Sequence, residues 1–244
     1  MNNTTKNIAL SFNRHAHEYD EHNHLQNITG TKLIKLISHQ SNQIKNLIDL
    51  GCGTGVVTKQ LAESLNYKNL YAIDIAEKAL AITKINLREM GAHIYQENFD
   101  NLNTFNQTFD LVFANMSLQW SQDLFSTLSH ITTKMNSQGI MAISLPLPGT
   151  FNELQNVYAC NPLTEVIIIQ DYFRKLNFEI ILTEKDIMQF QFNHTRDALQ
   201  SIKNIGANYV IQRPHKGLTG KTKLKQLQLT TLTYYVGYFI ARKC

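Results

Sequence analysis

Three glycines and two acids stand where a nucleotide could be bound. Gly51, Gly53 and Gly55 lie in the stretch LIDLGCGTGVV, directly after an apolar run and before a helical pattern. Glycines at such a turn let the backbone come close to a ligand. Asp49 ends this apolar run and Asp74 ends the next, and a carboxylate at the second place can accept hydrogen bonds from ribose hydroxyls. The pattern therefore predicts a nucleotide-binding loop between a strand and a helix.

The glycine spacing alone leaves the kind of nucleotide open. The dinucleotide fingerprint is G-x-G-x-x-G, whereas here the third glycine comes one residue early and Val56 occupies the expected place. The loop is not a P-loop either, because no G-K-[ST] follows. A nicotinamide-dependent oxidoreductase and a binding protein without catalytic activity stay open as alternatives to a transferase.

The composition is that of a globular protein. Of the 244 residues, 43% are hydrophobic and 17% charged. No apolar run approaches the roughly 18 residues that span a bilayer, and the N-terminus lacks the apolar core of a secretion signal. Cys52, Cys160 and Cys244 are far apart, which disfavours a disulfide framework or a structural zinc. We expect a cytoplasmic protein with no metal and with neither a nucleic acid nor a membrane as a partner.

Strand and helix patterns alternate along the first two thirds of the chain. Strands are predicted at 46–50, 69–74, 92–96, 109–115, 139–145, 178–192 and 231–242. Helices are predicted at 56–65, 77–90, 123–135, 151–158, 164–177 and 195–205, and the first 40 residues have a polar helical pattern in which Leu33, Ile34, Leu36 and Ile37 share an apolar face. The alternation predicts an α/β fold with a mostly parallel sheet of seven strands, helices on both faces and an antiparallel last strand.

We see no linker, so we expect one domain over residues 1–244. Within it, residues 1–40 form an N-terminal helical cap, 41–145 a cofactor-binding core, and 146–244 the substrate-side helices and the last strands.

The stretch LIDLGCGTG resembles the first motif of class I S-adenosylmethionine-dependent methyltransferases, whose fold is Rossmann-like. The resemblance implies that Asp49 lies near the methionine amine and that the loop glycines lie under the sugar. It further implies that Asp74 holds the ribose and that Ile75 packs on the adenine. Cys52, between the first two glycines, belongs to the same loop.

Two later stretches extend this implied cofactor site. In QENFDNL, Asn98 stands where the family usually has an acid near the adenine amine, with Phe99 beside it. The amide oxygen of an asparagine can still accept a hydrogen bond there. In ANMSLQW, the resemblance implies that the methionine end of the cofactor lies beside Asn115, Met116, Ser117 and Trp120.

Other stretches resemble a narrower family, the malonyl-[acyl-carrier protein] O-methyltransferases of biotin synthesis, also called the BioC type. They are FNRHAHEYDEHNHLQ near the N-terminus, SLQWSQDLFSTL, ALQSIKNIGAN and the closing LTYYVGYFIARK. The resemblance implies methyl transfer to the free carboxylate of a malonyl thioester, with S-adenosyl-L-homocysteine as product. Malonyl-acyl carrier protein, an acidic partner, or malonyl-CoA would be the substrate.

The chain departs from this family where the substrate carboxylate could be held. Members usually carry an Arg-Phe pair before the helix that we predict from residue 164, whereas this chain reads CNPLTEV. Lys203 and Arg196 lie seven positions apart on one predicted helix, so they share a face and could supply positive charge. Tyr19, by family position near the mouth of the site, could contact the cofactor and orient one carboxylate oxygen.

The C-terminal part is basic. From Lys203 to Lys243 the chain has Lys and Arg but neither Asp nor Glu. A solvated basic face and a docking surface for an acidic carrier protein both explain this charge. In the second interpretation, steering of the carrier is expected from Lys216, Lys221, Lys223 and Lys225.

Two related activities stay open. Mitochondrial assembly factors that are said to modify a protein arginine share the pattern D-I-A-E-x-A-L and a similar L-x-W-x-x-D-L stretch with this chain. A methyltransferase acting on another small carboxylic acid would also fit the residues.

Overall fold

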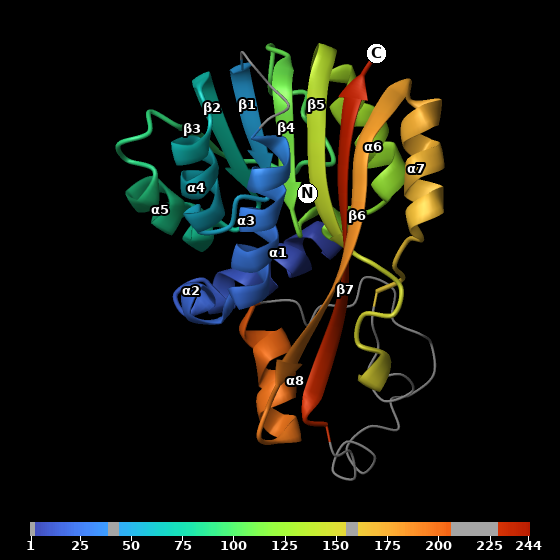
Figure 1. Ribbon diagram of the computed structural model, residues 1–244. Helices are drawn as coiled ribbons and strands as arrows, with labels where there is room; N and C mark the ends of the chain where they lie inside the picture. Colours follow the sequence, from blue (N-terminus) through green and yellow to red (C-terminus); the bar gives the residue numbers. More distant parts are fainter. Residues whose placement is uncertain (1–2, 39–43, 155–160, 206–228) are drawn as a thin grey trace.

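The computed structural model describes residues 3–38, 44–154, 161–205 and 229–244, and the statements below refer to these (Figure 1). Seven strands form one sheet in the order β3-β2-β1-β4-β5-β7-β6. Their bounds are β1 Ile44–Leu50, β2 Tyr67–Asp74, β3 His93–Gln96, β4 Phe109–Asn115, β5 Met135–Pro146, β6 Phe178–Gln191 and β7 Thr231–Lys243.

The direction of the strands follows the prediction. β1, β2, β3, β4 and β5 pair in parallel, and only β7 runs antiparallel to its two neighbours, β5 and β6. The chain moves outward from β1 to β3 on one side and from β4 to β5 on the other, so the strand order reverses between β1 and β4. Ligands of open α/β sheets bind outside the carboxyl ends of the strands at such a reversal.

The helices also lie close to their predicted positions, with two differences. α5 ends at Asn86, although its pattern predicts a helix to residue 90, because the chain turns at Leu87 and reaches Gly91 at a φ of 60°. Of the helix predicted at 151–158, the described residues form a short 3-10 turn, η2, over Asn152–Leu154, and residues 155–158 lie outside the described part of the chain. The helix bounds are α1 Asn3–His15, α2 Tyr19–His22, α3 His24–Ile37, α4 Val56–Ser64, α5 Glu77–Asn86, α6 Leu124–Thr133, α7 Val166–Lys175, α8 Thr195–Asn204 and the 3-10 turn η1 Leu118–Trp120.

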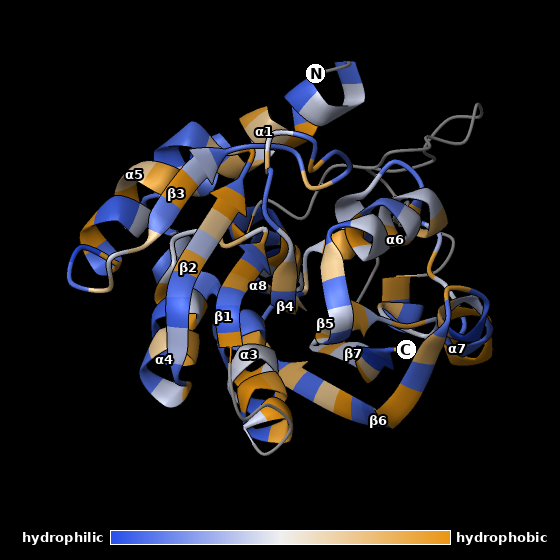
Figure 2. Ribbon diagram, turned by 90° about the horizontal axis from the view of Figure 1, so that it is seen from above, coloured by the Kyte–Doolittle hydropathy of each residue, from blue (hydrophilic) through white to orange (hydrophobic). Residues whose placement is uncertain are grey.

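Alternating residues of the central strands form two separate cores. In β1, Leu47 packs with the apolar face of α3 and with α4, while its neighbour Ile48 packs with α6 and α7 on the opposite face of the sheet. The alternation is that of strands buried on both faces. Figure 2 shows α3 and α4 on one side of the row of strands and α6 on the other. Of the predicted apolar face of α3, Leu33, Ile34 and Ile37 are buried and Leu36 is partly exposed.

The long β6–β7 pair extends past the carboxyl ends of the other strands, with α8 beside it (Figure 1). Ala198 and Ile202 of α8 are buried in the core that this pair shares with α3. Lys32 of α3 binds Glu184 at 2.9 Å and Asp186 at 2.8 Å, which fastens the N-terminal helices to β6. No helix among the described residues is long and apolar enough to cross a membrane.

Candidate active site

The loop between β1 and α4 holds two glycines that fit against the protein itself. φ is 79° at Gly51 and 80° at Gly55, in the left-handed region that favours glycine. A Cβ on Gly51 would lie 2.5 Å from Cβ of Ser117, and one on Gly55 would lie 2.9 Å from Cγ2 of Thr83. Gly55 lines none of the cavities described below. Gly55 therefore allows the loop to pack closely on α5 and does not contact a ligand.

Gly53 differs from the other two, because a side chain here would point into open space. Its φ is 56°, and the nearest atom to an added Cβ is Cε1 of Tyr19, at 3.8 Å. The space in front of Gly53 belongs to a cavity at the carboxyl ends of the strands. A ligand can therefore approach the backbone at this position.

Asp74, the last residue of β2, is held by the loop that it faces. Its carboxylate accepts the backbone N–H of Gly53 at 2.9 Å and that of Ala76 at 2.7 Å. Burial raises the pKa of Asp74, and the backbone N–H groups oppose that rise by stabilising the charged form. The two bonds leave lone pairs of the carboxylate oxygens for a ligand.

Asp49, near the end of β1, is a buried acid with one neutral partner. It is 3% exposed, and Thr58 donates its hydroxyl to Oδ2 at 2.6 Å. Burial raises the pKa of Asp49 to about 7; the bond from Thr58 opposes this shift, and the charge of Asp74 adds to it. A nearby cation would remove this penalty, so the position favours a positively charged ligand group.

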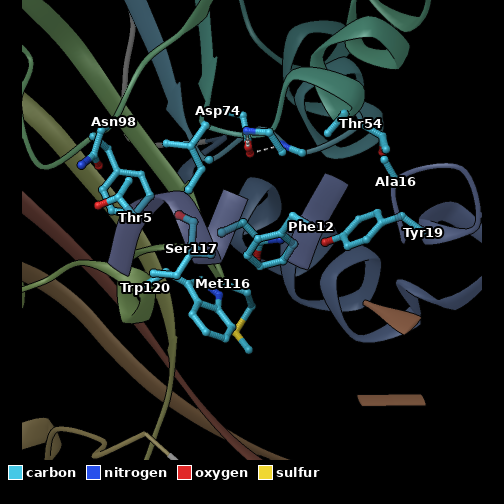
Figure 3. A pocket seen from close by; sticks show the side chains of 18 of the residues that line it. Thr5, Phe12, Ala16, Tyr19, Thr54, Asp74, Asn98, Met116, Ser117 and Trp120 are labelled. Carbon is cyan, nitrogen blue, oxygen red and sulfur yellow. Dashed lines mark hydrogen bonds between the residues drawn. The ribbon is translucent and has the colours of Figure 1, made fainter. Parts of the chain in front are cut away.

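Gly51, Gly53 and Asp74 line one cavity of about 760 Å³, counted to its open mouth, which we call the main cavity. Figure 3 shows its labelled side chains converging from the strand ends and from the N-terminal helices. The lining residues are Thr5, Ile8, Phe12, Ala16, Tyr19, Gly51, Gly53, Thr54, Asp74, Ile75, Ala76, Ala79, Asn98, Phe99, Asp100, Asn115, Met116, Ser117 and Trp120.

Asn98 and Asp100 form a hydrogen-bonded pair at one end of the main cavity. Asn98 donates its amide to Asp100 at 3.2 Å and accepts the backbone N–H of Asp100 at 3.0 Å. Asp100 also accepts the Thr127 hydroxyl of α6 at 2.7 Å. An aspartate at position 98 would place a second carboxylate beside Asp100, which gives the asparagine a physical reason.

The tip of β4 supplies the opposite wall. Met116 has a φ of 49°, unusual for a residue with a side chain, and its N–H is held by Ser144 at 3.0 Å. Ser117 donates its hydroxyl to the carbonyl of Leu50 at 2.6 Å, which joins the β4 tip to β1. Strained backbone of this kind clusters at functional sites.

The N-terminal helices close the main cavity. Of their residues, only Tyr19 was predicted from the sequence to lie at the site. Thr5, Ile8, Phe12, Ala16 and Tyr19 all line the cavity. Thr5, Ile8 and Phe12 are spaced three and four residues apart on α1, so they share one face of that helix, and this stripe is the signal that could have revealed them. Ala16 follows the end of α1, and Tyr19 begins α2. The ring of Phe12 meets that of Trp120 edge-on, with centroids 5.5 Å apart.

The hydroxyl of Tyr19 stays protonated at neutral pH. Burial raises its pKa above the usual range, and the charges of Asp74 and Asp20 add to the effect. In Figure 3 the hydroxyl points into the cavity towards Phe12. Tyr19 is therefore a hydrogen-bond donor and not a base.

A side cavity of about 360 Å³ adjoins the main one at α3 and the start of α4. It shares Tyr19, Gly51, Gly53, Thr54 and Asn115 with the main cavity and is also lined by Asn23, Gln26, Asp49, Cys52, Val56 and Val57. Burial raises the pKa of the Cys52 thiol, so this cysteine stays neutral. The structure thus brings Asp49 and Cys52 to the same region as the rest of the predicted cofactor site.

An outer cavity of about 1010 Å³ lies on the far side of η1, between the ends of β5 and α7. Its polar side chains are those of Gln119, Ser121, Gln122, Asp123, Asn161 and Thr164. None of the described residues that line the main, side and outer cavities is Lys, Arg or His.

The two predicted cations lie elsewhere. Arg196 and Lys203 are exposed at the first and last turns of α8, and neither lines any of the three cavities. Their geometry therefore gives no support to the predicted carboxylate contact. The predicted docking residues Lys216, Lys221, Lys223 and Lys225 lie outside the described residues. Within the described residues, no three His, Cys, Asp or Glu side chains converge as metal ligands do.

Known proteins share both the sequence and the fold. Residues 41–204 match the family described as "Methyltransferase domain". A malonyl-[acyl-carrier protein] O-methyltransferase of Coxiella burnetii is 36% identical over 100% of this chain and 98% of its own length. The enzyme of that name from Acetivibrio thermocellus is 27% identical over 82% of this chain and 78% of its own.

Among solved structures, the N-methyltransferase NodS of Bradyrhizobium japonicum, in complex with S-adenosyl-L-homocysteine, superposes with a TM-score of 0.60. It covers 97% of this chain and 98% of its own at 12% identity, which demonstrates a shared fold. The fold is thus that of the class I methyltransferases, as the sequence predicts. S-Adenosylmethionine, the cofactor that the sequence resemblance implies, agrees with this fold and with the matched family. From its full-length similarity, the chain belongs to the malonyl-[acyl-carrier protein] O-methyltransferase family.

Proposed function

We propose that this protein transfers the methyl group of S-adenosylmethionine to the free carboxylate of a malonyl thioester carried by acyl carrier protein. The full-length similarity to a malonyl-[acyl-carrier protein] O-methyltransferase carries the proposal. The methyl ester so formed would start the synthesis of the pimeloyl chain of biotin. A related protein of Saccharophagus degradans, named a biotin biosynthesis bifunctional protein, supports this assignment.

The residues of the main and side cavities fit the cofactor. The open space before Gly53 would take the sugar, and the lone pairs left on Asp74 would take its hydroxyls. Ile75 and Phe99 would contact the adenine, with the second lone pair of the Asn98 oxygen for its amine. Asp49 would face the ammonium group of the methionyl end.

At the methionyl end, the tip of β4 completes the proposed site. Asn115, Met116, Ser117 and Trp120 line the main cavity there. When bound, S-adenosylmethionine supplies an electrophilic methyl group on its sulfonium. The residues at this tip would therefore stand beside the reacting atoms.

The acceptor needs orientation rather than activation. A carboxylate is ionised at pH 7, so no general base has to remove a proton from it. Holding two reactants in attack geometry contributes up to about 7–11 kcal/mol to lowering a barrier. The protein's part is to hold one carboxylate oxygen in line and to keep water out, and the N-terminal helices that close the main cavity suit that task.

Neutral donors suit the nucleophile. Among the residues that the structure describes, no Lys, Arg or His lines the three cavities, so none of these residues would quench the negative charge of the attacking oxygen by a close ion pair. We assign the orientation of the second oxygen to the Tyr19 hydroxyl, which the raised pKa keeps as a donor. The outer cavity, on the other side of η1, would take the thioester arm.

Mass spectrometry of the acyl carrier protein tests the proposal. With S-adenosylmethionine and malonyl-acyl carrier protein, we expect the thioester-bound acyl chain of the carrier to gain one methyl group. Acetyl-acyl carrier protein, which lacks the free carboxylate, should gain none, and malonyl-CoA in parallel measures the need for the carrier. Methylation of a protein side chain would contradict the proposal and favour the assembly-factor alternative. If no malonyl thioester is methylated, the proposal is also contradicted, and another small carboxylic acid is favoured as the acceptor.

A further inference from the structure

One buried polar atom of the side cavity has no partner in the described protein. The carboxamide oxygen Oε1 of Gln26 is buried and receives no hydrogen bond from the described residues. A buried acceptor without a donor is costly, which suggests that a ligand completes it. Gln26 lines the side cavity together with Asp49.

The backbone of Gln26 is firmly placed. Its carbonyl accepts the amide of Asn115, at the tip of β4, at 2.8 Å and the hydroxyl of Thr29 at 3.1 Å. Gln26 is thereby fixed beside the strand ends, although it belongs to α3. The residue is the last one of the stretch FNRHAHEYDEHNHLQ.

The other amide groups of the side cavity already have partners. Asn23 donates to Asp20 at 3.1 Å and accepts from Asn27 at 2.7 Å. Asn115 donates to Gln26 and accepts the Ser144 hydroxyl at 2.7 Å. Two acceptors therefore stay available, the Gln26 oxygen and the Asp49 carboxylate. A ligand group that satisfies both must be rich in donors and positively charged, as a primary ammonium is.

We infer that the carboxamide oxygen of Gln26, together with the carboxylate of Asp49, binds the ammonium group of the cofactor's methionyl end. The inference rests on the S-adenosylmethionine of the proposed function. It makes α3 a direct part of cofactor recognition. The N-terminal helices would then bind the amino-acid end of the cofactor, in addition to closing the cavity over it.

Calorimetric titration with two ligands tests this role without relying on activity. S-Adenosyl-L-homocysteine carries the amino-acid end, whereas 5′-methylthioadenosine has the same adenine, ribose and thioether without it. Gln26→Met keeps the length of the side chain and removes the oxygen. We expect this variant to lower the affinity for S-adenosyl-L-homocysteine about tenfold or more, the usual effect of losing a hydrogen bond to a charged group. Its affinity for 5′-methylthioadenosine should stay that of the wild type.

The variant Gln26→Glu distinguishes whether the ligand is bound by the carboxamide oxygen or by the amide N–H groups of Gln26. Glutamate keeps an acceptor, so affinity for S-adenosyl-L-homocysteine should stay close to that of the wild type if the ammonium is bound. If the ligand were instead a carboxylate bound by the amide N–H groups, glutamate would repel it and weaken binding more than methionine does. That result overturns the inference.

Gln60→Met is the matched control. Gln60 lies on α4, accepts the Thr31 hydroxyl of α3 at 3.0 Å, and lines none of the three cavities. It should bind both ligands as the wild type does. Equal weakening of both ligands by Gln26→Met, or no weakening at all, refutes the inference. Failure of the wild type to bind S-adenosyl-L-homocysteine would instead refute the cofactor assignment.

Discussion

The two ends of the active-site region are built differently. At the proposed cofactor end, candidate residues sit at the tips of β1, β2 and β4, and two of them are carboxylates, of which Asp49 is buried and Asp74 half-buried. At the proposed substrate end, beyond β5, the described residues that line the outer cavity supply amides, hydroxyls and the carboxylate of Asp123, but no cation. The charges Arg196 and Lys203 lie exposed on α8.

The difference follows from chain topology. Parallel strands bring their carboxyl ends to one edge of the sheet. Residues at the strand ends therefore lie close together, independently of the conformation of the loops that join the strands. The substrate side depends on α1, α2 and the segments after β5, whose positions rest on tertiary packing. The proposed cofactor residues at the strand ends can therefore be predicted from the sequence, whereas residues that the N-terminal helices and the later segments contribute cannot.

The largest expected effect separates two glycines of the cofactor end. Gly53→Val would fill the open space of the main cavity, so we expect loss of S-adenosyl-L-homocysteine affinity of about 100-fold or more. Gly55→Val would meet Thr83 of α5 instead. It should lower the stability by about 1–3 kcal/mol beyond the strain that both variants share.

Calorimetry and thermal unfolding measure the two effects separately. Gly53→Val should lose binding with the smaller drop in Tm, and Gly55→Val should show the larger drop. If Gly55→Val keeps its Tm and loses binding as Gly53→Val does, Gly55 contacts the ligand and our distinction between the glycines is wrong.

The second effect concerns the charge of Asp49. With a pKa of about 7 in the folded protein, ionising this carboxyl costs roughly 4 kcal/mol more than in water. Asp49→Asn should therefore raise the Tm of the cofactor-free protein at pH 8 by about 10 °C, while it weakens the binding of S-adenosyl-L-homocysteine.

The pH dependence of that stabilisation follows from proton binding. Between pH 4 and 7 the folded state holds the Asp49 proton and the unfolded state has lost it, so the stability contributed by this group falls as the pH rises. The gain of Asp49→Asn should consequently shrink when the pH is lowered to 5. A variant that is less stable than the wild type at pH 8 would show that the ionised carboxylate is stabilising in the empty site.

Much of the fold and of the cofactor end could be predicted from the sequence. Alternating apolar strands and helices specify the sheet, and Asp49, Asp74 and Gly53 come together because their strands are neighbours. The stripe from Thr5 to Phe12 was missed, because a polar helix does not reveal which surface it covers. The exposed position of Lys203 was equally hidden, because spacing on α8 defines a face but not the element that it meets.

The smallest expected effect concerns the substrate end. Lys203→Met and Arg196→Met remove exposed charges, so each should change the stability by less than about 0.5 kcal/mol and leave the KM for malonyl-acyl carrier protein unchanged. Steady-state kinetics with both variants measure this. A several-fold rise of KM in one variant alone would show that α8 holds the substrate carboxylate after all, and the contrast between the two ends would be lost.

The most direct test of the account is a calorimetric titration of the wild-type protein with S-adenosyl-L-homocysteine at pH 6 and pH 8, with NAD as comparator. Because the cofactor's ammonium requires the ionised form of Asp49, whose pKa is about 7 in the empty site, affinity should be about tenfold higher at pH 8. NAD should not bind. Equal affinity at both pH values would contradict the role of Asp49, and binding of NAD without S-adenosyl-L-homocysteine would contradict the methyltransferase account itself.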